Sequence, residues 1–317
     1  MPVNLDKPQL WKSDICHSVD MYNTWFMQSA PEVFRETRRK VTKHVENTLA
    51  LTRNLAEITP DVLREHPAVL PSLRMSTCPP IAVDRLIGLA GVSKNLVHSM
   101  EKGGLPAKTP LASLRHDLHK ISSLIRSLAD RDVFHWLEAR LTPTEQDIHR
   151  AASIVADRLT NANTNPIIRN AQEERQFSII SLWLEEQGYE KFSENTKYDA
   201  IPAGTYGFRV NFPVKLPDGK SAIQIPVDTA IMPKSAKIGD LPILIEAKSA
   251  GDFTNTNKRR KEEAQKVNQL RRTYGNHVRF ILFLCGYFDV GYLGYEAAEG
   301  IDWVWEHRIQ DLAAFGI

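Results

Sequence analysis

Two apolar runs of strand length decide how this chain folds: I-Q-I-P-V-D at residues 223–228 and L-P-I-L-I-E-A-K at residues 241–248. Side chains alternate between the two faces of a strand, so Glu246 and Lys248 share one face while the isoleucines before them take the other. The same rule turns Asp228 away from the apolar residues of its own run. If the two strands are neighbours, two carboxylates and an ammonium group meet where the strands leave the core.

This trio favours one kind of chemistry. Clustered carboxylates repel each other and a buried lysine is unfavourable, unless a divalent cation lies between them. Ligands from Asp228 and Glu246 are all oxygen, which favours a hard ion such as Mg²⁺. Such an ion lowers the pKa of a bound water and neutralises charge on a phosphate, while Lys248 would hold or help deprotonate the attacking water. The pattern predicts a phosphodiester-hydrolysis site, although solvated strand ends also carry such strings.

Size and composition restrict the class of protein. A chain of 317 residues favours two domains, and 42% hydrophobic with 25% charged residues is typical of globular proteins. The formal charge of +2 means that any basic surface must be local. Cys16, Cys78 and Cys285 form no C-x-x-C pair, which excludes a cysteine zinc finger and fits a reducing cytoplasm. We find no apolar signal core and no apolar run of membrane length, so we expect a cytoplasmic protein.

The first half of the chain has helical periodicity. We predict an N-terminal all-α domain over residues 1–165, with helix from residue 11 to about residue 57 and again over 111–160, broken at Pro31 and Pro60. An H-x-x-H pair, His116 and His119, has no third ligand nearby in the sequence. We therefore expect that pair to have a surface or capping role.

Residues 82–104 have a helix-turn-helix pattern. A short helix ends at Gly91, Ser93 stands in the N-cap position, and a second helix ends at two glycines. In DNA-binding versions the second helix enters the major groove, which would direct Ser93, Lys94 and Asn95, with His98 as a further candidate, at DNA. Two packed helices joined by glycine are also common in all-α domains, so DNA contact, dimerisation through the helical domain and a purely structural role all stay open.

The second half, residues 166–317, predicts an α/β domain. The stretch N-A-N-T-N-P before it is typical of a hinge. In the helix that follows, Glu174 shares a face with Phe177 and Leu184, so it lies either at the rim of the core or at the metal site. The remaining expected elements are a hairpin of strands 205–215 and 223–228 joined at 216–220, a helix over 256–274, a buried strand over 278–288, a strand over 301–305 and a closing helix over 309–315.

The predicted helix 256–274 is strongly basic at its start. Residues 258–272 contain seven Lys or Arg, Lys261 among them, against two Glu. Such a face beside an acidic metal pocket would hold the backbone of a polyanion in line with that pocket.

The order of these elements matches the PD-(D/E)xK nuclease core, with Val227-Asp228 where the motif has Pro-Asp. Beyond the core, the chain resembles the XamI family of type II restriction endonucleases. The similar strings are W-K-S-D-I at 11–15, G-L-A-G-V-S-K-N-L-V at 88–97, N-P-I-I-R-N-A-Q-E-E-R-Q at 165–176 and I-E-A-K-S-A-G-D-F-T-N-T-N-K-R-R-K-E-E at 245–263.

The resemblance implies Mg²⁺-dependent cleavage of both strands of DNA at a short palindrome, of GTCGAC type if specificity is shared. Asp228 and Glu246 then bind metal, Lys248 is the catalytic lysine, and Glu174 matches a helix acid that some members of the superfamily add. Residues that fall where a loop and helix meet the duplex are Asn255, Asn257, Lys258, Arg259 and Arg260. Two cuts in a palindrome imply a two-fold homodimer, and a restriction system implies a cognate DNA methyltransferase.

Two other functions fit the same residues. One is a repair or recombination nuclease on the same core without site specificity. The other is a non-catalytic regulator that binds DNA through residues 82–104, although a binder has no need to keep Asp228, Glu246 and Lys248 in register.

Overall fold

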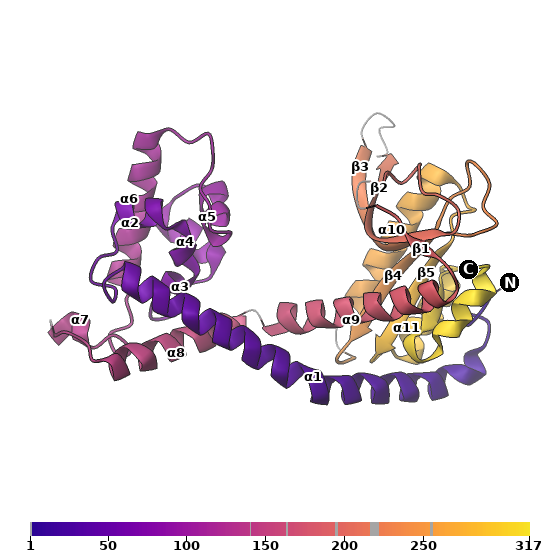
Figure 1. Cartoon of the computed structure of the whole chain (residues 1–317), viewed down its shortest axis with the longest axis horizontal. Coiled ribbons are helices and arrows are strands. Elements are labelled where there is room, and N and C mark those ends of the chain that lie inside the picture. The colour runs from indigo at the N-terminus through magenta and orange to yellow at the C-terminus, as the bar shows by residue number, and fades with distance from the viewer. Residues whose placement is uncertain (1, 140, 163, 194–195, 216–221, 254–255) are drawn as a thin grey trace. The chain divides into compact units, whose positions relative to one another are not determined.

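The computed structural model describes residues 2–139, 141–162, 164–193, 196–215, 222–253 and 256–317, with backbone alone at 164–165 and 256–260 (Figure 1). The chain forms two compact units. One consists of Met1–Pro31 with Ile168–Ile317, and the other of Glu32–Ile167. The predicted turn at 216–220 and the centre of the predicted hinge, residue 163, lie outside the described residues.

The start of the chain belongs with the C-terminal unit. The backbone N–H groups of Val3 and Asn4 donate to Asp302 at 2.6 and 3.0 Å. The indole rings of Trp11 and Trp303 pack edge to face, with their centroids 5.4 Å apart. The predicted domain of residues 1–165 is therefore corrected at its start, because helical periodicity is local and does not reveal a partner 300 residues away.

Helix α1 (Pro8–Leu51) continues through Pro31, so the predicted break there is wrong. Proline removes one backbone hydrogen bond, and a long helix tolerates this as a kink. The break at Pro60 is confirmed, since Pro60 opens the next helix. The following helices are α2 (Pro60–Glu65), η1 (Pro67–Val69), α3 (Leu70–Met75), α4 (Val83–Ala90), α5 (Lys94–Glu101), α6 (Leu111–Ser127), α7 (Trp136–Ala139) and α8 (Glu145–Ala162).

The predicted helix-turn-helix pattern is present as α4 and α5. Gly91 ends α4 in the left-handed conformation at φ 59°, which glycine adopts without steric strain. Ser93 occupies the N-cap position of α5. Leu86 of α4 and Leu96 of α5 lie in one apolar core with α6.

The C-terminal unit is built on a six-stranded mixed sheet in the order β1-β2-β3-β4-β5-β6. β2 pairs antiparallel with β3, and β3 with β4, whereas β1–β2, β4–β5 and β5–β6 pair in parallel. The strands are β1 (Glu190–Lys191), β2 (Thr205–Lys215), β3 (Ala222–Met232), β4 (Ile243–Ala250), β5 (Phe280–Gly286) and β6 (Asp302–Trp305). The helices are α9 (Thr164–Glu186), α10 (Thr256–Tyr274), α11 (Val290–Ala298) and the 3₁₀ segment η2 (Glu306–Phe315).

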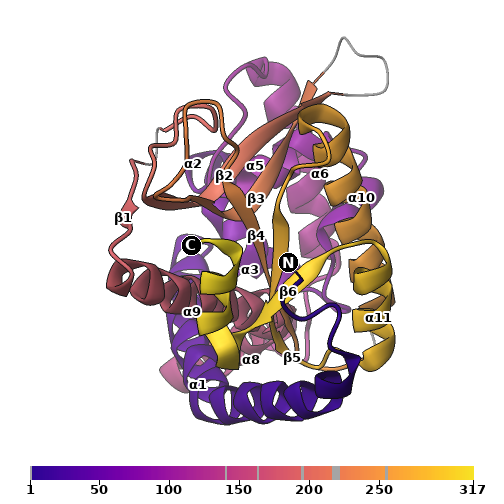
Figure 2. The ribbon, with the colours of Figure 1, turned by 90° about the vertical axis from the view of Figure 1, so that its right-hand side faces the viewer.

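Helices cover both faces of this sheet (Figure 2). One apolar core joins it to α10 and α11 through residues such as Leu270 and Leu293. The other joins it to α9 and η2 through Leu184 and Leu312. The predicted fold class, a mixed sheet flanked by helices after a helical region, is confirmed. Three details differ, since β1 and α11 were not predicted and the closing helix is a 3₁₀ segment.

In the described part of the chain, no helix has both the length and the apolar character needed to cross a membrane.

Candidate active site

Asp228 and Glu246 face each other across β3 and β4. These strands pair antiparallel with Thr229 opposite Ile245. One step further in the same register sets Asp228 opposite Glu246, and directly opposite residues of a sheet point to the same face. The backbone N–H of Ala247 donates to Asp228 Oδ2 at 2.9 Å and fixes that carboxylate just beyond the paired part of β3 and β4.

Two lysines bind the Glu246 carboxylate. Lys248 Nζ donates to Glu246 Oε1 at 2.8 Å, and Lys266 Nζ, from α10, donates to Oε2. Glu246 is buried, with 6% of its surface exposed. Lys266 counted among the basic residues expected to face DNA, but its side chain lies against the carboxylate. Nothing local in the sequence distinguishes Lys266 from the other lysines of that helix.

Burial and the facing charges shift the pKa of each group. Burial is the largest cause, and the negative charge of Glu246 the second largest, of a rise in the pKa of Asp228 to about 6. Burial also acts to raise the pKa of Glu246, but Lys248 and Lys266 together hold it below its ordinary value. Burial acts to lower the pKa of Lys248. The negative charges of Glu246 and, to a smaller extent, Glu263 raise that pKa by more, so the lysine is held as an ammonium.

These shifts fit a divalent cation site. An aspartate whose ionisation is opposed by burial and by a second carboxylate needs positive charge beside it. The donors that Asp228 and Glu246 offer are carboxylate oxygens, which hard cations prefer. The two residues on β3 and β4 can therefore serve as ligands to one ion, as their sequence pattern predicts.

A pair of buried acids lies behind Lys248. Glu263 of α10 accepts a hydrogen bond from the Tyr292 hydroxyl at 2.6 Å, and Glu296 of α11 is buried as well. Burial raises the pKa of Glu263, and Lys248 acts in the opposite direction. The sequence indicated only two acids on a basic helix, not this buried pair.

Arg209 has a strained backbone beside the site. Its φ is 54°, in the left-handed region that non-glycine residues avoid. The β2–β3 register continues on both sides, with Phe208 opposite Thr229 and Val210 opposite Val227, so Arg209 lies at the step opposite Asp228. Phe208 packs in the core with α9, whereas Val210 packs in the core with α10. The kink therefore turns β2 at the level of Asp228.

Glu174 lies on the outer side of Arg209. It accepts a hydrogen bond from Arg209 Nη2 at 2.6 Å, and 64% of its side chain is exposed. It lines a cavity of about 970 Å³ together with Phe177 and Phe208. Of the two predicted positions, the exposed carboxylate beside Phe177 fits the rim of the core, and among the described residues no hydrogen bond joins it to Asp228 or Glu246. Its predicted catalytic role stays a prediction.

The amides of α9, rather than Glu174, reach the strand of the site. Gln176 Nε2 donates to the backbone carbonyls of Lys248 at 3.5 Å and Phe283 at 3.4 Å. Gln172 accepts a hydrogen bond from the Ser249 hydroxyl. Both glutamines are buried, so α9 braces the end of β4. Neither was predicted as a site residue.

The predicted DNA-binding residues fall into three groups. Asn255 lies outside the described residues, and the same holds for the side chains of Asn257 and of Lys258, Arg259 and Arg260, although α10 begins at Thr256 as predicted. Lys261 is exposed. Ser93, Lys94 and Asn95 are exposed on the helical unit. All of these contacts stay predictions.

Comparison with known proteins identifies the family. Residues 53–305, which include Asp228, Glu246 and Lys248, match the XamI restriction endonuclease family. The chain belongs to that family. This XamI-family chain is also 49% identical over 316 residues to "Type II restriction enzyme SalI" of Streptomyces albus G, covering 99% of each chain. No solved structure matches it.

Membership of the XamI family confirms the resemblance inferred from the sequence. The protein is a type II restriction endonuclease, a hydrolase that cleaves DNA at specific sites. The alternatives of a nuclease without site specificity and of a non-catalytic regulator are thereby excluded. The α4–α5 segment and the sheet site both lie within the matched residues.

Proposed function

We propose that this endonuclease hydrolyses a phosphodiester bond in each strand of a short palindrome with Mg²⁺ as cofactor, through Asp228, Glu246 and Lys248. The observation that carries the proposal is that Asp228 lies one step beyond the last paired residues of β3 and β4, bonded to the Ala247 N–H next to Glu246, with Lys248 bonded to Glu246. A site of GTCGAC type is the proposed target, supported by the family resemblance and by the identity with the Streptomyces relative.

Asp228 and Glu246 would hold the Mg²⁺ ion. When bound, Mg²⁺ would supply positive charge that polarises a phosphate oxygen and lowers the pKa of a water. Support for Mg²⁺ over a softer metal comes from the donors, which are carboxylate oxygens with no histidine or cysteine among the described residues that contact them.

Lys248 acts as a fixed cation. Its ammonium group lies against Glu246, where it orients a water and faces the phosphate being cut. The water oxygen forms a bond to phosphorus, the bond from phosphorus to one sugar oxygen breaks, and the water proton is passed to that leaving oxygen or to solvent. Because neighbouring acids raise its pKa, Lys248 serves in this state to stabilise charge on the phosphate rather than to take the proton.

DNA contact is proposed at two places. The exposed N-terminal end of α5, with Ser93, Lys94 and Asn95, suits base edges, and the basic start of α10 around Lys261 suits the phosphate backbone. A palindrome cut in both strands calls for two copies of the site, so we propose a two-fold homodimer. We further propose a cytoplasmic location, supported by the unpaired cysteines, and a cognate methyltransferase that protects the host's own sites.

Digestion of DNA of known sequence tests the proposal. With Mg²⁺, we expect discrete fragments whose ends map to one palindrome, and no fragments when EDTA removes the metal. Asp228→Ala and Lys248→Ala should abolish cleavage while a gel-shift assay shows DNA binding largely retained. Cleavage by either variant at the wild-type rate would disprove the residue assignment, and fragments at a different palindrome would disprove the GTCGAC-type target.

A further inference from the structure

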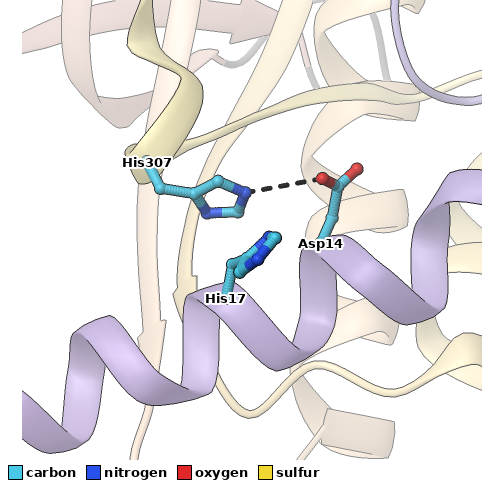
Figure 3. Close-up of side chains that lie close together, drawn as sticks. All are labelled: Asp14, His17 and His307. Atoms are coloured by element: carbon cyan, nitrogen blue, oxygen red, sulfur yellow. Dashed lines mark hydrogen bonds and ion pairs between the residues drawn. The ribbon is translucent and has the colours of Figure 1, made fainter.

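A second cluster of potential metal ligands joins the two ends of the chain (Figure 3). Asp14 and His17 lie three residues apart on α1, so they share one helix face. His307, from the start of η2, lies against them. One ligand atom from each residue lies within 4.8 Å of the other two. All three belong to the sheet-containing unit.

The distance between Asp14 and His307 is that of two ligands to one ion. Asp14 Oδ1 and His307 Nε2 are 3.5 Å apart, longer than the 2.7–3.2 Å of an ordinary N–H···O hydrogen bond. Two ligands bound tetrahedrally to zinc, each at about 2.0–2.1 Å, lie roughly 3.4 Å apart. The existing separation therefore needs almost no change to admit the ion.

Neighbouring groups hold the first two ligands in place. Arg308 Nη1 binds the other oxygen of Asp14 at 3.1 Å and leaves Oδ1 toward the histidines. Arg308 Nη2 also forms an ion pair with Asp311 Oδ2 at 2.8 Å, and this pair limits the repulsion between Arg308 and a bound cation. The ring of Trp305 stacks on His307, with their centroids 5.9 Å apart. Outer partners of this kind fix ligand orientation in metal sites.

The His307 ring is suited to bind metal at neutral pH. Burial, together with the charges of His17 and Arg308, keeps its pKa below the ordinary value although Asp14 acts in the opposite direction. The neutral imidazole is the form that donates a lone pair to a metal. Its Nδ1 is buried and has no hydrogen-bond partner among the described residues, whereas its Nε2 contacts Asp14.

We propose that Asp14, His17 and His307 bind one divalent transition-metal ion, with zinc as the reference ion, at a site distinct from the nuclease centre. Two imidazoles and one carboxylate are a zinc set, whereas the carboxylates of Asp228 and Glu246 suit Mg²⁺. A fourth position stays open to water. Such an ion would clip α1 to the C-terminal segment and stabilise the folded unit, because the ligands come together only on folding.

A zinc titration of the full-length, metal-stripped protein against a chromophoric chelator tests this site. We expect one tight equivalent in the wild type, and a dissociation constant at least about tenfold higher in His17→Ala, since even the loss of an outer partner weakens metal sites by about 10–100-fold. His116→Ala is the matched control, because His116 and His119 are exposed with the same spacing on a helix. Asp228→Asn controls for zinc at the nuclease centre, and both controls should bind as the wild type does.

Two further readouts make the test decisive. Co²⁺ should give the visible absorption of a tetrahedral site in the wild type and in Asp228→Asn, and not in His17→Ala. His17 is exposed, so its variant should keep the wild-type circular dichroism spectrum. The proposal is overturned if the wild type has no tight equivalent, if correctly folded His17→Ala binds as tightly, or if binding is lost in Asp228→Asn instead. None of these results bears on Mg²⁺-dependent cleavage, so the proposed function stands or falls separately.

Discussion

Replacing Asp228 with asparagine should make the metal-free protein more stable. Asparagine has nearly the same shape, and its oxygen can still accept the hydrogen bond from the Ala247 N–H. The substitution removes a negative charge that burial and Glu246 disfavour. A residue needed for metal binding thus destabilises the fold when no metal is bound.

The size and pH dependence follow from the pKa of Asp228. The pKa of Asp228 rises from 3.8 to about 6 in the folded protein. Each pKa unit corresponds to about 1.4 kcal/mol, so the ionised Asp228 side chain opposes folding by at most about 3 kcal/mol. Between these two values the folded state binds more protons than the unfolded state, so stability falls as pH rises. The full penalty is present above pH about 6, and it disappears below pH about 4.

Chemical denaturation in EDTA measures the effect. Near pH about 7.5, Asp228→Asn should raise the free energy of unfolding by up to about 3 kcal/mol, and near pH about 4 the gain should vanish. Exposed Asp20, in the same unit, gives the control Asp20→Asn, which should change stability by less than about 0.5 kcal/mol. A variant no more stable than wild type at the higher pH, or equally stabilised at both, would refute the reasoning.

Three further outcomes follow from the same site. Lys248→Gln should lower the cleavage rate by about 100-fold or more at unchanged DNA affinity, measured by single-turnover digestion and gel shift, because charge on the phosphate loses its fixed cation. At limiting Mg²⁺, cleavage should decline as pH falls through about 6, because protonated Asp228 is a poor ligand. A pH titration showing no decline there contradicts that assignment. Lys266→Gln should lower the Mg²⁺ concentration needed for half-maximal cleavage, because the ammonium group of Lys266 is removed and no longer competes with Mg²⁺ for Glu246. If the variant needs more Mg²⁺ than the wild type, Lys266 assists metal binding instead.

Local patterns predicted the centre of the site. The period of two in residues 223–228 and 241–248 fixed the face of each side chain, and their apolar character placed both segments in one sheet. Helix α10 has the predicted bounds Thr256–Tyr274, and β5 is buried along its whole length. These features depend on neighbours close in the chain, so the sequence contains the information they need.

Contacts between distant segments could not be predicted in the same way. Lys266 looks like any lysine of a basic helix until α10 packs over β4. His307 and Asp14 are separated by almost the whole chain, so no spacing rule joins them. Helix α11 was not predicted. Its N-cap is Asp289, which accepts a hydrogen bond from the Tyr292 N–H, and an aspartate just before a short apolar run is a sequence signal from which the helix could have been predicted.

The unfavourable features of the sheet gather at one place, which is itself an argument about function. Arg209 has a strained φ opposite Asp228, the pKa of Asp228 is raised, and the pKa of the buried acid Glu263 near Lys248 is raised as well. A sequence selected for stability alone would not keep these in one region, because each could be relieved by a common substitution. A cation and a phosphate would relieve the charge imbalance directly. The metal-free protein is therefore the strained state, and binding of metal and DNA should stabilise this part of the sheet.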